Sequence, residues 1–454
     1  MEPDITAALF APLFASMTVA AGLIFMAGWL ACKPLHATWL IIALMLLDSS
    51  QISLAFQYGL WIYPEDLFFC ILFLASLVRL TLFVPLKTVP GAWWLIGSIQ
   101  LFLAVIGFKS FGSAAGVDFR GHFYLWITVT YFCSVDWSDA MLRRFANAWV
   151  CCATVLCLMI YYRWTMSAID PAYAAEMMAL DITGVRFRVV GSSAALTIAV
   201  AFLILMFRML CGRLTGLSRA LPGLYFITVL VLQHRSVWVS LIAGYLCLMW
   251  TQRKQAAGKR ALRAIGMLLL PLALLFLLSG SQNAVLDSVR TSANQAISLE
   301  EGTMVGRVVN WQELLVKWVN SKNPMTYILG NAYGSGYNPV ESQDGENIYD
   351  MVPHNHLVHM LYRGGLVGVC CTLSVFIRLG CAGVAAVKRK DKYWAPFFVA
   401  VFAAIFAYYI PYWAMYSTGM LLGIAVSYFD LQKTRARVCP ALDSGPAQTA
   451  MARA

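Results

Sequence analysis

Long apolar runs are the feature that most restricts how this chain can fold. A helix needs about 20 apolar residues to cross about 30 Å of hydrocarbon, and runs near that length recur along the sequence. They cover residues 7–31, 37–60, 66–84, 92–108, 121–135, 143–164, 189–210, 262–279, 356–386, 394–410 and 412–430. Hydrophobic residues make up 60% of the chain and charged residues 12%, proportions far from those of a soluble domain. The pattern predicts an all-α polytopic membrane protein.

A further apolar stretch, between residues 220 and 250, is interrupted at its centre by Gln233, His234 and Arg235. An arginine at the middle of a membrane must face protein or water, so we expect two short helices that meet at a polar point. Placing arginine there costs about 2.5 to 3.5 kcal/mol, which indicates that Arg235 has a function. With this pair, the sequence predicts 12 or 13 membrane spans.

Basic residues gather in alternate connecting loops, which gives the expected orientation. The clusters are Arg79 with Lys87; Arg143 with Arg144; Arg208, Arg213 and Arg219; Arg253 through Arg263; Arg378 through Lys392; and Lys433 through Arg437. Loops rich in Lys and Arg stay in the cytoplasm, so the net charge of +11 reflects topology and not a nucleic-acid-binding surface. Glu2 and Asp4 occupy the positions at which a signal peptide carries positive charges. We therefore expect the first apolar run to stay in the mature protein and not to be cleaved.

Two long loops, 165–188 and 280–355, then lie on the outer side, and neither contains any of the 12 cysteines, so no disulfide framework is predicted. The second loop is long enough to form a small subdomain. The expected organisation is a transmembrane bundle (1–279), a periplasmic loop subdomain with an amphipathic helix (280–355), C-terminal transmembrane helices (356–430) and a disordered cytoplasmic tail (431–454).

Several enzyme classes lack their sequence motifs here. The chain has no P-loop, no dinucleotide-binding fingerprint, no HExxH and no GxSxG. No acidic pair at the start of a loop suggests the metal site of many glycosyltransferases, so we expect neither metal nor cofactor. Any phosphate must therefore be bound by arginine, whose planar fork suits bidentate contact with a diphosphate.

Candidate arginines on the outer side are Arg120 in GVDFRGHFYLW, Arg188 in GVRFRVVGSS, Arg235 in LQHRSVW and Arg307 in GRVVNWQELL. The alternative for each is that it reaches lipid headgroups or pairs with an outer acidic residue. Around Arg307, the segment VGRVVNWQELLVKWV repeats apolar residues at helical spacing: Val308, Trp311, Leu315, Trp318 and Val319. This predicts an amphipathic helix that lies along the membrane or caps a cavity. The following ILGNAYGSGYN predicts an irregular loop.

Residues 353–368, PHNHLVHMLYRGGLVG, place three histidines and an arginine at the front of an apolar helix. Asn355 is the expected N-cap, so His354 lies at the junction of loop and helix. A neutral imidazole there can accept a proton from a sugar hydroxyl. A zinc pair of His354 and His356 is an alternative, but no further ligands stand at a recognisable spacing. For His356 and His359 we favour packing or hydrogen bonding in the core.

These motifs together resemble the bacterial O-antigen ligase and O-antigen polymerase superfamily. The segment HNHLVHMLYRGGLVG is similar to its motif at His354, Asn355, Val358, Leu361, Gly365, Leu366 and Gly368. GRVVNW, ILGNAYGSG, HRSVW and the less specific RVVGSSAAL resemble other family segments, and the similarity covers about residues 118–370. The sequence departs from the family in the late position of Gly336 and in a span count of 13 against the usual 12.

The resemblance implies a metal-independent, inverting glycosyltransferase of the bacterial inner membrane whose active site faces the periplasm. Its donor is a glycan on undecaprenyl diphosphate. Arg120, Arg235 and Arg307, with Arg188 as a weaker candidate, would bind the diphosphate, and His354, supported by Asn355, would deprotonate the acceptor. A repeat-unit acceptor makes the protein an O-antigen or exopolysaccharide polymerase, which we favour. A lipid A core acceptor makes it a ligase in lipopolysaccharide synthesis.

Two other classes of protein are also compatible with the sequence. A transporter or flippase for lipid-linked oligosaccharides would line a conduit with the same arginines, but it needs no general base and no large outer subdomain. A membrane scaffold would leave Arg235 without a function. The partners expected are the lipid-linked donor, the acceptor and membrane lipids. A regulator of chain length is a further partner that the sequence leaves open.

Overall fold

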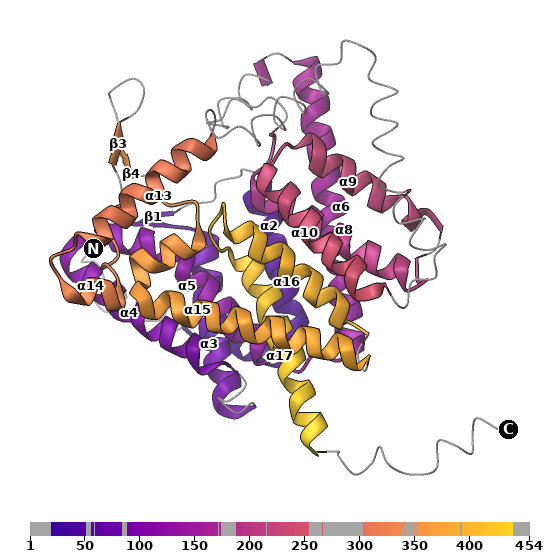
Figure 1. Cartoon of the computed structure of the whole chain (residues 1–454), viewed down its shortest axis with the longest axis horizontal. Helices are drawn as coiled ribbons and strands as arrows, with labels where there is room; N and C mark the ends of the chain where they lie inside the picture. The colour runs from indigo at the N-terminus through magenta and orange to yellow at the C-terminus, as the bar shows by residue number, and fades with distance from the viewer. Residues whose placement is uncertain are drawn as a thin grey trace, which may run out of the picture.

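The structure, a computed structural model, describes residues 20–50, 56–58, 60–83, 89–170, 172–173, 188–214, 216–253, 266, 303–337, 339–341, 348–350, 352–390 and 393–438. Helices dominate this part of the chain, and the strands form two small antiparallel hairpins (Figure 1). The structure thus has the all-α architecture that the apolar runs predict.

In chain order, a helix from Ala20 to Cys32 precedes α2 (Pro34–Ser50), β1 (Phe56–Tyr58), β2 (Leu60–Ile62), α3 (Pro64–Leu82), α4 (Gly91–Phe111), α5 (Ser113–Cys133), α6 (Asp139–Ile169), α8 (Ser192–Leu210), η2 (Gly216–Arg219), α9 (Leu221–Val231), α10 (Arg235–Gln252), α13 (Thr303–Val319), α14 (Pro324–Leu329), β3 (Pro339–Glu341), β4 (Ile348–Asp350), α15 (His356–Arg389), α16 (Ala395–Tyr409) and α17 (Tyr416–Val438).

Among the described helices, α4, α6, α8 and α15 are long and apolar enough to cross a membrane. Ala20–Cys32 and α2, bent by 112° at their junction, make a fifth span if they are counted together. The chain is therefore a polytopic α-helical membrane protein. The total of 12 or 13 spans stays a prediction, because the start of the first run and all of 262–279 except residue 266 lie outside the described residues, and the described helices provide four or five candidate spans.

The run at 37–60 does not form one span. Helix α2 ends at Ser50, and Phe56–Tyr58 pairs with Leu60–Ile62 as a hairpin. The polar residues Asp48, Ser49 and Ser50 interrupt the apolar pattern at the point where the helix ends. The break predicted between 220 and 250 is confirmed, because α9 ends at Val231 and α10 begins at Arg235.

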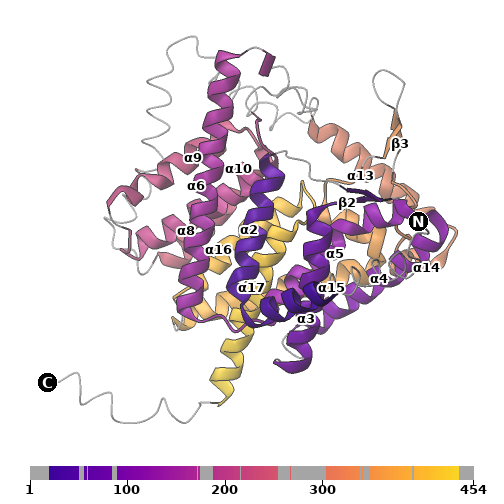
Figure 2. The same ribbon diagram turned by 180° about the vertical axis from the view of Figure 1, so that it is seen from behind.

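The helices form two groups that α16 joins. In one group α6, α9 and α10 pack against α8, which is almost entirely buried. In the other group α3 and α4 pack against α5, α15 packs against α4, and α17 lies along α5. Helix α16 contacts α8, α10 and α15, so it connects the groups (Figures 1 and 2). The hairpins, α13 and α14 lie beside the second group, away from the C-terminal end of α17 (Figure 1).

The predicted loop subdomain contributes α13, α14 and the hairpin β3–β4, while 280–302 lies outside the described residues. Helix α13 is amphipathic as expected, but its buried face differs from the expected one. Asn310 and Leu314 are buried, whereas Leu315 and Val319 are exposed. The helix packs on α14 and α15, and these neighbours decide which of its faces is covered.

At the C-terminus, α17 extends to Val438, eight residues beyond the expected boundary at 430. The helical conformation of 431–438 corrects that part of the predicted disordered tail. Residues 439–454, the rest of the tail, lie outside the described residues.

Candidate functional site

His354 stands directly before α15, as the sequence predicts. Asn355 is the N-cap, and its side-chain oxygen accepts hydrogen bonds from the backbone N–H groups of Leu357, at 2.9 Å, and Val358, at 3.0 Å. These bonds satisfy two of the donors that a helix start leaves open. The capped turn fixes the backbone beside His354, whose half-buried ring lies edge-on to that of Tyr412 with centroids 5.6 Å apart.

Arg307, on the first turns of α13, reaches the same tyrosine. Its Nη1 donates to the Pro411 carbonyl oxygen at 3.2 Å and its Nη2 to the Tyr412 hydroxyl at 3.4 Å. The guanidinium also lies over the Tyr412 ring, 4.8 Å from its centroid. A cation over an aromatic face is held by the ring quadrupole. Arg307 and His354 therefore both lie against the ring of Tyr412.

The environment of His354 keeps its imidazole neutral. Burial, and next the positive charge of Arg307, lower the pKa of His354 from its ordinary value to about 4. Burial disfavours the charged form, and a like charge nearby adds to that effect. At neutral pH the imidazole therefore has a lone pair with which to accept a proton.

Two further arginines lie at the break between α9 and α10. Arg188 donates from Nη2 to the carbonyl oxygen of Gln233 at 3.1 Å, and Arg235 is the first residue of α10. Gln233 has a φ of 56°, a left-handed conformation that costs a non-glycine residue energy and is common at functional sites. The positive charges of Arg188 and Arg307 both act on the Arg235 guanidinium. Three like charges gathered in this way favour an anionic ligand.

Tyrosines next to Arg307 connect α16 to α8. The Tyr412 and Tyr408 rings stack with centroids 5.0 Å apart, and the hydroxyls of Tyr408 and Ser192 share a hydrogen bond of 2.8 Å. Tyr408 belongs to α16 and Ser192 begins α8. The start of α8, the end of α16 and the start of α15 therefore meet at the site formed by His354, Arg188, Arg235 and Arg307.

Arg120 has a different set of contacts. Its Nε forms an ion pair with the Asp66 carboxylate at 2.8 Å, and its guanidinium lies over the Tyr63 ring, 4.8 Å from the centroid. Asp66 is the third residue of α3 and also accepts a hydrogen bond from the Tyr63 backbone N–H at 2.8 Å. Arg120 thus already has a counter-ion, as the alternative interpretation of the outer arginines expects.

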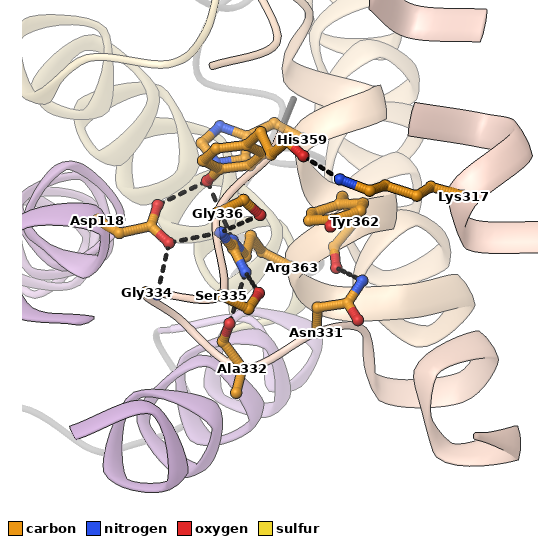
Figure 3. Close-up of polar contacts among 11 residues, drawn as sticks. Asp118, Lys317, Asn331, Ala332, Gly334, Ser335, Gly336, His359, Tyr362 and Arg363 are labelled. Carbon is orange, nitrogen blue, oxygen red and sulfur yellow. Dashed lines mark hydrogen bonds and ion pairs between the residues drawn. The ribbon is translucent and has the colours of Figure 1, made fainter. Parts of the chain in front are cut away.

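Sequence reasoning missed a buried charged cluster around Arg363 of α15 (Figure 3). Arg363 is fully buried, and its Nη2 lies 2.7 Å from the carboxylate of Asp118 on α5. Asp118 also accepts hydrogen bonds from the Tyr337 hydroxyl at 2.6 Å and the Gly334 backbone N–H at 2.9 Å. The signal was available in the sequence, because Arg363 is an arginine inside the apolar run 356–386.

The same arginine holds the irregular loop after α14. Arg363 donates to the Ser335 hydroxyl at 2.7 Å and to the Gly336 carbonyl oxygen at 3.3 Å (Figure 3). The loop approaches α15 closely because Gly365 has a φ of 60° and lies against the end of α14. The predicted irregular conformation of ILGNAYGSGYN is confirmed for residues 330–337, whereas Ile328 and Leu329 belong to α14 and residue 338 lies outside the described residues. The charged cluster connects this loop to the helix that begins beside His354.

His356 and His359 are buried core groups, as we favoured. His359 Nε2 and the Tyr337 hydroxyl share a hydrogen bond of 2.6 Å, and the His356 ring packs against Tyr409 with centroids 4.7 Å apart. Within the described ranges, no group of three or more His, Cys, Asp or Glu side chains is placed to hold a metal ion.

No model of a protein family matches the chain, and no curated protein sequence matches it either.

Proposed function

We propose that this protein transfers a glycan from a lipid diphosphate to a sugar hydroxyl without a metal ion. The observation that carries the proposal is the position of Tyr412, whose ring contacts both the His354 ring and the Arg307 guanidinium. A group able to take a proton and a group able to bind phosphate oxygens therefore lie against the same aromatic ring.

The donor would bind through its diphosphate. Arg307, Arg188 and Arg235 supply three positive charges at the meeting point of α8, α10, α13 and α15. As the glycosidic bond breaks, the electron pair and negative charge go to the departing diphosphate, and fixed guanidinium groups stabilise that charge as it develops. Arg120 is left out of this proposal because Asp66 already balances its charge.

His354 would take the proton of the acceptor hydroxyl. The acceptor oxygen then forms its bond to the anomeric carbon from the face opposite the diphosphate, which inverts the configuration. A pKa of about 4 makes the imidazole of the free protein a weak base. A bound diphosphate offsets the charge of Arg307, so it would raise that pKa and strengthen the base when the donor is present.

The resemblance of the motifs at 304–368 to the O-antigen ligase and polymerase superfamily supports an undecaprenyl-linked donor and a repeat-unit acceptor. The protein would then be a polysaccharide polymerase of the bacterial inner membrane. The alternating basic loops support an orientation in which His354 faces the periplasm. Asn355 would position His354 through the helix cap and make no contact with substrate.

The test uses the purified full-length protein and lipid-linked repeat units, with and without a chelator. We expect a ladder of longer glycans in both conditions, and its loss in His354→Ala. His36→Ala is the matched control, because the His36 ring packs on Trp29 and, within the described part of the chain, does not contact the proposed site. Transfer of the glycan only to lipid A core would show that the protein is a ligase and not a polymerase. Movement of the lipid-linked glycan between leaflets without formation of a glycosidic bond would show that the protein is a transporter and not an enzyme.

A further inference from the structure

A cavity of about 260 Å³ lies between α3, α4 and α5. Its walls include the aromatic side chains of Phe108, Phe119 and Phe123, and its polar part is the ion pair of Asp66 and Arg120. The proposed glycosyl transfer makes no use of this cavity or of its ion pair.

The cavity borders the apolar surface of the protein. Phe108 and Val117, which line it, are 47% and 60% exposed. Phe108 belongs to α4, one of the helices long and apolar enough to span a membrane, and Phe102 and Val105 of the same helix are also exposed. Large apolar side chains exposed on a membrane span face lipid. The environment from which a ligand enters this cavity is therefore lipid.

The polar part of the cavity carries two opposite charges. Arg120 and Asp66 lie 2.8 Å apart, and each side chain is 24% exposed, so both present a surface to a ligand. Asp66 is also fixed by the Tyr63 backbone N–H, which donates to its Oδ2, and by the Tyr124 hydroxyl, which donates to its Oδ1; Arg120 is fixed by the Tyr63 ring. A ligand that carries only a negative charge would meet the Asp66 carboxylate as well as the guanidinium.

We propose that this cavity binds a phospholipid whose headgroup contains both a phosphate and a primary ammonium, as phosphatidylethanolamine does. The phosphate would accept hydrogen bonds from Arg120, and the ammonium would donate to Asp66. One acyl chain would lie along Phe119 and Phe123, where its burial is favourable. A quaternary ammonium has no N–H to donate to Asp66, and an anionic headgroup has no cation for it, so both fit less well.

Native mass spectrometry of the delipidated full-length protein tests the proposal. Phosphatidylethanolamine, phosphatidylcholine and phosphatidylglycerol are added separately at equal concentrations. We expect phosphatidylethanolamine to bind about tenfold more tightly than the other two lipids, the difference that one charged hydrogen bond makes. Equal binding of the three lipids, or tighter binding of phosphatidylglycerol, overturns the proposal.

Two variants locate the binding site. Arg120→Gln removes the phosphate ligand, and Gly116→Leu fills the cavity beside Phe108, whose ring lies 3.0 Å from the position of an added Cβ. Both should reduce binding about tenfold. Gly28→Leu is the matched control, because an added Cβ there meets nothing within 4 Å. Unchanged binding in Gly116→Leu overturns the proposal, as does a monosaccharide that displaces the lipid. A fluorescence melting curve of each variant confirms that it is folded.

Discussion

Arg363 of α15 and Asp118 of α5, 245 positions apart in the sequence, form an ion pair of 2.7 Å in which the arginine side chain has no exposed surface. The pair joins α15, which begins beside His354, to α5, and Arg363 also donates hydrogen bonds to the loop that follows α14. Removing one partner of a buried ion pair leaves the other charge without compensation, which costs about 3 to 5 kcal/mol.

Asp118→Asn and Arg363→Met should therefore each lower the stability of the protein by about 3 kcal/mol or more. The double variant should lose less than the sum of the two, because no isolated charge remains. Thermal unfolding in detergent measures the effect. Asp136→Asn is the control, since Asp136 is exposed. Asp118→Asn with the melting temperature of that control would show that the pair contributes nothing.

Gly365 and Gly364 give a sharper pair of variants. Gly365 has a φ of 60°, and an added Cβ would lie 2.3 Å from the Ile328 carbonyl oxygen, so alanine cannot be accommodated. At Gly364 the nearest atom to an added Cβ is the Met360 Cε, at 3.5 Å. Gly365→Ala should destabilise the protein by more than about 1 kcal/mol, and Gly364→Ala should be near neutral. Equal melting temperatures for the two variants would contradict the close approach of α14 and α15.

Arg307→Gln should raise the pKa of His354. The arginine charge opposes protonation of the imidazole, so its removal moves the value upward from about 4. Burial remains, which keeps the new value below about 6.5. Histidine NMR signals of selectively labelled protein, followed from pH 3 to 8, report the midpoint. Arg120→Gln is the matched arginine control and should leave the midpoint in place. A midpoint that falls or stays unchanged in Arg307→Gln would show that the Arg307 charge does not lower the pKa of His354.

Protonation of His354 should also set the lower pH limit of transfer. The neutral imidazole is the base, so kcat/KM falls as the pH drops through the pKa of the free protein, near 4. In Arg307→Gln that acid limb should move to higher pH, in the same direction as the NMR midpoint. The measurement is the initial rate of transfer at donor concentrations below KM. If the acid limb of kcat/KM stays at the same pH in Arg307→Gln, the base is a group other than His354.

Arg235 tests the role of the guanidinium group. Arg235→Gln should lower transfer by about 10² to 10³, the usual loss when one donor to a developing anion is removed. Arg235→Lys keeps the charge but loses the planar fork, so it should recover only part of the activity. Rates with lipid-linked donor and a thermal melt of each variant make the comparison. Arg389→Gln, at the far end of α15, serves as the control.

The local features of the fold were predictable because they depend on residues close in sequence. The break at 233–235 follows from three polar residues inside an apolar stretch, and the cap at Asn355 follows from its position before an apolar helix. The prediction of one span over 37–60 was wrong, also because of residues close in sequence. Hydropathy averaged over the run hides the polar residues at 48–50, where α2 ends.

Partners distant in sequence could not be predicted from the pattern. The sequence placed Arg120 beside the other outer arginines, but packing of α3 against α5 supplies Asp66 as its counter-ion. Tyr412, which relates His354 to Arg307, belongs to the turn between α16 and α17 and matches none of the quoted motifs.

By itself, the sequence determined the membrane environment, most helix positions and the chemical character of His354 and the arginines, because hydropathy, capping and charge are local properties. Only the tertiary structure decided that Asp66 balances the charge of Arg120 and that Arg307 and His354 lie against one tyrosine. That outcome depends on how the helices pack, since a charge in a low-dielectric interior takes its properties from the groups that packing brings within a few ångströms.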